Sequence, residues 1–159
     1  MNGSATVVRS GCMAKDADMI LSEFILLGIG GKELSEENAA QTAKALNIIQ
    51  PDFIRVHATG IKLESKLGEF VRDGSFTLQS EEEIVIEQKL FLQQLHEMDS
   101  YYVNEHIVNL LLEVRGNLRT EKQEMLSTID RFLTLPPDER LLFTVGRRLN
   151  IFSVSYTHL

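Results

Sequence analysis

The order of apolar and polar positions divides the chain into two parts. Residues 5–60 have the pattern of helix, strand, loop, helix and strand, whereas residues 80–150 have a mostly helical pattern. The connection between them, 60–79, is punctuated by glycine. We therefore predict a first portion over residues 1–79 and a helix-rich portion over residues 80–152. Residues 153–159 do not continue the helical pattern and resemble translated sequencing adapter, so we expect a non-native tail there.

The first portion has the pattern of a βαβ unit. The nearly continuous apolar run from Ile20 to Leu27 is typical of a strand buried on both faces. A helix follows, with Ser35 as its expected N-cap and Pro51 as the residue that stops it. Residues 52–58 then have the pattern of a second strand. Strand, helix and strand in this order predict parallel strands joined by a right-handed crossover, and so an α/β fold.

The second portion is predicted to be mostly helix. Ser80 begins a capping box that opens a long helix, and Thr120 begins another. Residues 100–103 fit a short third strand, and the uniformly apolar stretch 107–114 is expected in a core. A last helix is predicted over 138–145, after two consecutive prolines.

Composition and charge narrow the class of protein. Sixteen Lys and Arg against 23 Asp and Glu give a net charge of −7, which opposes binding to nucleic acid, because phosphate backbones need a concentrated basic surface. The longest apolar run, Phe24–Leu27, is far shorter than the roughly 20 residues that span a bilayer. The N-terminus has no signal-peptide pattern. We therefore expect a cytoplasmic protein that binds neither nucleic acid nor membranes.

Glycines and one glutamate mark a candidate cofactor site around the first strand. Gly28, Gly30 and Gly31 join the strand to a helix N-terminus, an arrangement that lets backbone pack closely against a ligand. A tight strand-to-helix turn explains the same glycines equally well. Glu23 interrupts the apolar strand and therefore needs a partner, a ligand or solvent, because burying a lone carboxylate is costly.

A second set of polar residues belongs to the second strand and to the segment after the third. Arg55 and His57 alternate with aliphatic residues, so we expect them on the face turned away from the helices. There Arg55 would bind a carboxylate or phosphate, or else pair with Glu23 across the strands. His106 is a candidate substrate contact. We predict no metal site, because His57 and His106 have no fixed ligand spacing.

Several runs together carry a resemblance to a known family: Leu21–Glu33, Asn38–Ala43, Pro51–Val56, Asn104–Leu111 and Asp130–Leu133. They resemble radical S-adenosylmethionine (radical SAM) enzymes over roughly residues 10–152, and look like the second half of their partial (β/α) barrel. The resemblance implies a parallel TIM-type barrel fragment followed by a helical extension. It also implies that the strand end with Gly28, Gly30 and Gly31 lies along the adenosyl group of S-adenosylmethionine. We place Glu23 with these glycines in the expected cofactor-binding set. Arg55, His57 and His106 would line the interior that holds the substrate.

The motif that defines the family, C-x3-C-x2-C, is absent, because Cys12 is the only cysteine. The resemblance therefore implies a C-terminal fragment whose parent cleaves S-adenosylmethionine reductively at a 4Fe–4S cluster, and which is inactive alone. No catalytic residue is assigned, and the substrate, a small molecule or a peptide, is not specified. The alternative is a complete, non-catalytic binding module that uses apolar helices over 105–115 and 120–134. A weaker alternative is another class of barrel enzyme that works without iron.

Overall fold

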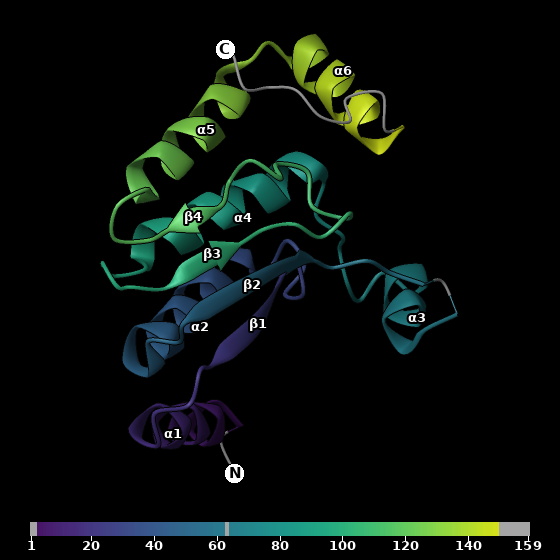
Figure 1. The fold of residues 1–159 in the computed structure, drawn as a ribbon. Coiled ribbons are helices and arrows are strands. Elements are labelled where there is room, and N and C mark those ends of the chain that lie inside the picture. Colours follow the sequence, from purple (N-terminus) through teal and green to yellow (C-terminus); the bar gives the residue numbers. More distant parts are fainter. Residues whose placement is uncertain (1–2, 63, 150–159) are drawn as a thin grey trace.

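A computed structural model describes residues 3–62 and 64–149, and in these residues the chain folds around one mostly parallel sheet. The strands lie in the order β1-β2-β3-β4; the first three are parallel and β4 runs antiparallel to β3. Their bounds are β1 Ser22–Leu27, β2 Phe53–Ala58, β3 Tyr101–Val103 and β4 Gly116–Asn117. The helices are α1 Gly3–Asp16, α2 Ser35–Ile49, α3 Lys66–Arg72, α4 Glu81–Gln94, α5 Lys122–Thr134 and α6 Pro137–Arg148. The α/β class is confirmed, with an open sheet (Figure 1).

The predicted βαβ unit is present. β1 and β2 pair in parallel along their whole lengths, from Ser22 opposite Phe53 to Leu27 opposite Ala58, and α2 forms the connection between them. The predicted third strand is β3, which pairs in parallel with the first half of β2. Parallel pairing brings the carboxyl ends of β1 and β2 to the same edge of the sheet.

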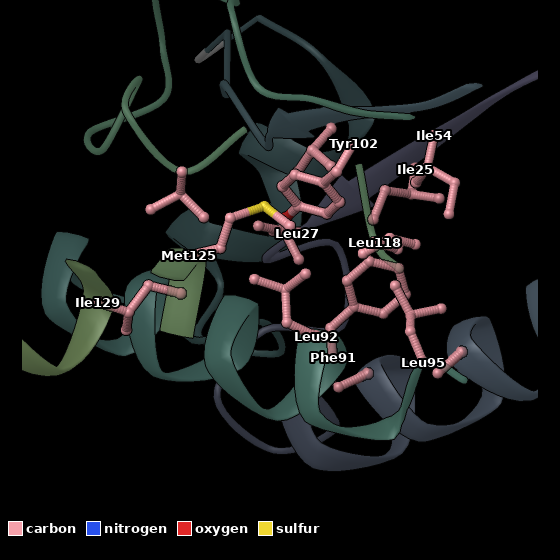
Figure 2. Close-up of a cluster of buried hydrophobic side chains, with 14 of the residues drawn as sticks. Ile25, Leu27, Ile54, Phe91, Leu92, Leu95, Tyr102, Leu118, Met125 and Ile129 are labelled. Atoms are coloured by element: carbon pink, nitrogen blue, oxygen red, sulfur yellow. The ribbon is translucent and has the colours of Figure 1, made fainter. Parts of the chain in front are cut away.

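Helices α2 and α4 cover one face of the sheet (Figure 1). The small side chains of Ala39 and Ala43 let α2 approach the strands closely, and both are buried. A contiguous apolar core fills the space between sheet and helices (Figure 2). Its members come from both predicted portions, which therefore share one core: Ile25, Leu27, Ile54, Val56, Phe91, Leu92, Leu95, Tyr102, Leu118, Met125 and Ile129.

The opposite face of the sheet is open. Phe24 is 64% exposed, Leu26 47% and Tyr101 41%, whereas Ile25 and Leu27 are buried. The prediction that the first strand is buried on both faces is therefore wrong for the described chain. The cause is that the helical layer lies on one side only, so every second side chain of β1 faces outward.

Two predicted helix caps differ from the structure. The capping box at Ser80 is confirmed, with both reciprocal hydrogen bonds to Glu83. At α2, however, the N-cap is Leu34, and Ser35 is the first helical residue, whose hydroxyl serves a contact described below. At α5 the predicted box at Thr120 is wrong, because Glu121 is the N-cap and has no side-chain cap bond.

Other local differences lie in the connections. The stretch 60–79 contains the short helix α3, which projects away from the sheet in Figure 1. Residues 107–114 form turns rather than a helix. Leu110, Leu111 and Val114 are buried as predicted for a core segment, whereas Ile107 is 73% exposed, so the prediction is wrong for the start of this stretch. The last helix, predicted over 138–145, is α6. The predicted tail 153–159 lies outside the described residues. Among the described helices none is long and apolar enough to cross a membrane.

Candidate functional site

Arg55, His57 and His106 lie together on the open face of the sheet. Alternation along β2 turns Ile54 and Val56 into the core and leaves Arg55 and His57 on the other side, as predicted. His106 comes from the segment after β3, and its ring stacks on that of His57 with 4.1 Å between ring centroids and 23° between planes. The structure thus brings the three predicted substrate-lining residues together.

Two buried asparagines place His106 over the sheet. Asn104 donates to the carbonyl oxygen of Leu111 (2.6 Å) and accepts a hydrogen bond from Asn109. Asn109 also donates to the Val56 carbonyl and accepts from the Ala58 amide, both at 2.7 Å. These bonds fasten the segment after β3 to the end of β2, so the position of His106 is set by buried backbone contacts. Sequence reasoning missed Asn109, because nothing local marks its long-range partners.

A small cavity of about 260 Å³ lies at this cluster. Besides the three polar residues, its walls include Phe24 and Glu105. The Phe24 ring meets the His57 ring edge to face, with centroids 5.5 Å apart and planes at 89°. The cavity therefore has an aromatic wall from β1 and a nitrogen-rich wall from β2 and the segment after β3.

Arg55 is held in place by a neutral partner. Its Nε donates to Ser22 Oγ at 3.0 Å, and its guanidinium carbon lies 5.7 Å from the centroid of the Phe53 ring. Its terminal nitrogens form no ion pair or hydrogen bond with any residue in the described part of the chain. The alternative prediction, a pair with Glu23, is wrong, because Glu23 shares the helix-covered face with Ile25, whereas Arg55 lies on the open face.

One arginine, two histidines and one glutamate line the cavity. Burial lowers the pKa of His57 below its ordinary value of 6.5, and the nearby charges of His106 and Arg55 lower it further. His106 Nδ1 accepts a hydrogen bond from the Val108 amide (3.4 Å), so a neutral His106 carries its proton on Nε2. Glu105 is the opposing acid, and it forms an ion pair with Arg115 at 3.0 Å.

The glycine turn after β1 is organised by a buried carboxylate. Glu87 of α4 is fully buried and accepts hydrogen bonds from the Gly28 amide (3.2 Å), Ser35 Oγ (2.9 Å) and Asn38 Nδ2 (2.7 Å). Sequence reasoning gave Glu87 no role in the site. The signal was available, since position 87 falls on the same helical stripe as the apolar positions 84 and 91.

Packing within the chain accounts for the glycines themselves. Gly28 and Gly31 have positive φ values of 81° and 63°, which favour glycine. A Cβ at Gly31 would lie 2.9 Å from the Thr77 carbonyl oxygen, and one at Gly28 would contact Ile84. The chain's own residues thus fill the space beside the turn, which favours the tight-turn interpretation of Gly28, Gly30 and Gly31 over a nucleoside packed there.

Glu23 does not join the glycines. It lies near the start of β1, and five residues of extended chain separate it from Gly28, or about 17 Å. Its pKa is raised by burial. The predicted cofactor set is therefore split between the two ends of the strand.

The described residues hold no set of metal ligands. Among them no group of three His, Cys, Asp or Glu side chains is placed to bind a metal ion. Iron–sulfur clusters need several cysteine thiolates, and the single cysteine, Cys12, lies on α1. A 4Fe–4S cluster thus does not fit the residues of this chain.

Comparison with known proteins assigns this chain to no family. A scan against family models finds no match, and neither do searches of curated proteins and of solved structures.

Proposed function

We propose that this chain is the C-terminal part of a radical SAM enzyme, and that the open face of its sheet lines the interior of a partial (β/α) barrel. The observation that carries the proposal is the one-sided packing of a parallel sheet. Parallel sheets are almost always covered on both faces, yet Phe24 and Leu26 face outward here. A barrel wall would have this geometry, with helices outside and the open face toward the interior.

The polar cluster supports the same proposal. His57 lies near the carboxyl end of β2, and His106 follows β3. In parallel α/β folds, ligands bind at the carboxyl ends of the strands, and in barrels these ends carry the functional side chains. Arg55, His57 and His106 would thus contact the substrate, in agreement with the resemblance of the sequence runs quoted above.

The roles within the parent enzyme would be divided. In radical SAM enzymes a 4Fe–4S cluster supplies the electron that cleaves S-adenosylmethionine, and this chain has no ligand set for such a cluster. Its own residues would instead form a wall of the barrel and bind and orient the substrate. We therefore expect the chain alone to be catalytically inactive.

The first test is to sequence the source DNA upstream of the codon for Met1. An open reading frame that continues upstream and encodes C-x3-C-x2-C is the expected result. The longer protein, reconstituted with iron and sulfide without oxygen, should then convert S-adenosylmethionine to 5′-deoxyadenosine when reduced, whereas the 159-residue chain should not. A stop codon and ribosome-binding site immediately before Met1 would refute the proposal.

One observation favours the second candidate, a non-catalytic binding module. A groove of about 780 Å³ runs between α5 and α6, with Met125, Phe132 and Phe143 among its apolar residues. This groove differs from the partner surface predicted from the sequence, which was made of apolar helices over 105–115 and 120–134. Residues 105–115 form no helix, and Met125 and Phe132 are mostly buried in the core.

The two candidates differ in the behaviour of the purified chain. A barrel wall exposes apolar side chains and the free edge of β1, so it should self-associate and bind a hydrophobic dye. A finished module should be monodisperse and unfold reversibly in one sharp thermal transition. Gel filtration and calorimetry on the same sample would separate the two.

A further inference from the structure

We infer that Arg55, His57 and His106 form a binding site for an anionic group, a carboxylate or a phosphate, carried by the substrate. The identification of the occupant as substrate rests on the proposed function, whereas the binding of an anion does not. Hydrogen-bond donors from these residues line one cavity and have no acceptor among the described residues.

Arg55 supplies most of these donors. A guanidinium carries five N–H groups, and Ser22 accepts only the one on Nε. The four N–H groups on the terminal nitrogens have no partner in the described part of the chain. Their planar arrangement matches the two oxygens of a carboxylate or phosphate, which an arginine can bind with paired hydrogen bonds.

The histidines extend the donor set on the same wall. The neutral form of His106 presents an Nε2 proton, because its Nδ1 accepts from the Val108 amide. The stacked His57 ring has no hydrogen-bond partner within the described residues, and the positive field of Arg55 and His106 opposes its protonation. A bound anion would oppose this positive field and favour the protonated form of His57. The site thus becomes more complementary as the anion enters.

The acidic side chain at the cavity does not cancel this charge. Glu105 lines the same cavity, but its Oε1 lies 3.0 Å from Arg115 Nη1, so its carboxylate pairs with that arginine and not with Arg55. The aromatic wall formed by Phe24 favours a ligand whose remaining part is apolar. Phe24 is 64% exposed beside the donors, so an apolar or aromatic body attached to the anion would bury its ring.

Size limits the part of the ligand that the site recognises. A cavity of about 260 Å³ is smaller than the roughly 300–1,000 Å³ of pockets that enclose a whole drug-sized molecule. It suits the anionic end of a ligand. The remainder would extend over the open face toward Leu26 and Tyr101.

Histidine modification tests the site at low protein concentration. The full chain would be treated with diethylpyrocarbonate at pH 7 and constant ionic strength, and the modification rate of each histidine measured by peptide mass spectrometry. Inorganic phosphate and benzoate are the two probes, one for each anion chemistry. His96, an exposed residue after α4, is the internal reference.

Saturating anion should slow modification of His57 and His106 at least about threefold, because a protonated or covered imidazole reacts poorly, and leave His96 unchanged. Protection by phosphate alone would assign a phosphate group, and protection by benzoate alone a carboxylate with an aromatic body. Equal slowing of His57, His96 and His106, or slowing that does not saturate, would overturn the inference.

Arginine variants show whether the protection depends on the proposed ligand contact. Arg55→Gln should raise the anion concentration needed for half protection about tenfold or more, because it removes the paired charged hydrogen bonds. Arg9→Gln, which makes the same charge change on α1, should leave it unchanged. His106→Gln provides a second variant at an exposed position and should also raise the anion concentration needed for half protection of His57, though less than Arg55→Gln does, because Arg55 supplies most of the donors. Equal half-protection concentrations in the Arg55 and Arg9 variants would refute the assignment.

The outcome is separate from that of the proposed function. If the upstream DNA encodes no cluster motif but Arg55-dependent protection is found, the radical SAM proposal fails and the anion site stands. If 5′-deoxyadenosine forms in the longer protein but neither probe protects His57, the anion site fails and the radical SAM proposal stands.

Discussion

The buried carboxylate of Glu87 should be a main determinant of stability around the glycine turn. Its three donors come from the end of β1 and the start of α2, so one side chain of α4 joins three elements. An ionised carboxylate accepts up to about four hydrogen bonds, and the structure supplies three. We predict that replacing Glu87 with alanine destabilises the fold well beyond the loss expected for an exposed helical residue.

The magnitude follows from the individual donors. The Gly28 amide is buried, and leaving it without an acceptor costs about 1–3 kcal/mol. Ser35 and Asn38 are only partly buried, and Asn38 also donates to the Leu26 carbonyl, so each loses less, about 0.5–1.5 kcal/mol. The removal of a buried charge offsets part of this sum. We expect a net loss of about 2–4 kcal/mol in the free energy of unfolding for Glu87→Ala.

A graded pair of variants separates hydrogen bonding from general packing. Glu87→Gln keeps one acceptor oxygen and the side-chain volume, so it should cost about 1–2 kcal/mol. Gln93→Ala lies on an exposed part of the same helix and should stay within about 0.5 kcal/mol of the unmodified chain.

Urea unfolding followed by far-ultraviolet circular dichroism measures these differences in the free energy of unfolding, since the chain has no tryptophan. Hydrogen exchange at the Gly28 amide adds a local measure and should accelerate in both Glu87 variants. A Glu87→Ala variant as stable as Gln93→Ala would show that the carboxylate is not a structural link.

Three further predictions concern other parts of the same fold. Gly31→Ala should destabilise the fold by about 2 kcal/mol or more, because a Cβ at position 31 meets the Thr77 carbonyl oxygen. Gly74 has a similar φ but open space around it, so Gly74→Ala should cost only about 1 kcal/mol. Urea unfolding of the two variants measures the difference. The pKa of His57 is lowered in the folded chain, so the unfolded chain binds more protons and stability should fall as the pH drops below about 6.5. The fall should be smaller in His57→Gln, and thermal unfolding measured across this pH range would show it. Phe24→Ser should reduce dye binding and self-association with little loss of stability, whereas Ile25→Ala should cost about 2–4 kcal/mol; equal losses would contradict the assignment of the two faces.

The pattern of the sequence predicted most of the elements because their signals are local. The alternation of Arg55 and His57 with Ile54 and Val56 placed the polar pair on the correct face, and a period of two is all that this inference needs. The capping box at Ser80 likewise depends on residues three positions apart. Elements of this kind form from neighbouring residues, so one sequence suffices to find them.

The features that were missed depend on contacts between distant segments. The apolar run of β1 predicted two buried faces, because Phe24 and Leu26 are apolar whether or not a layer covers them. Ser35 looked like a cap, but its hydroxyl serves Glu87, which is 52 residues away. The hydrogen bond from Asn109 to the Val56 carbonyl of β2 likewise joins residues that are 53 positions apart in the sequence. No motif of neighbouring residues marks either of these long-range hydrogen bonds.

The two faces of the sheet differ in how completely their groups are paired, and this difference bears on what covers the open face. On the helical side, the buried carboxylate of Glu87 has its hydrogen bonds, and the apolar side chains are in contact. On the open side, apolar Phe24 and Leu26 lie beside Arg55, whose charge has no counterpart among the described residues. An apolar partner surface alone would bury this guanidinium without a counter-charge, which is costly. A small anion alone would leave most of the apolar surface in water. A barrel wall that encloses an anionic substrate satisfies both requirements, which is the physical argument for treating the open face and the arginine–histidine cluster as parts of one site.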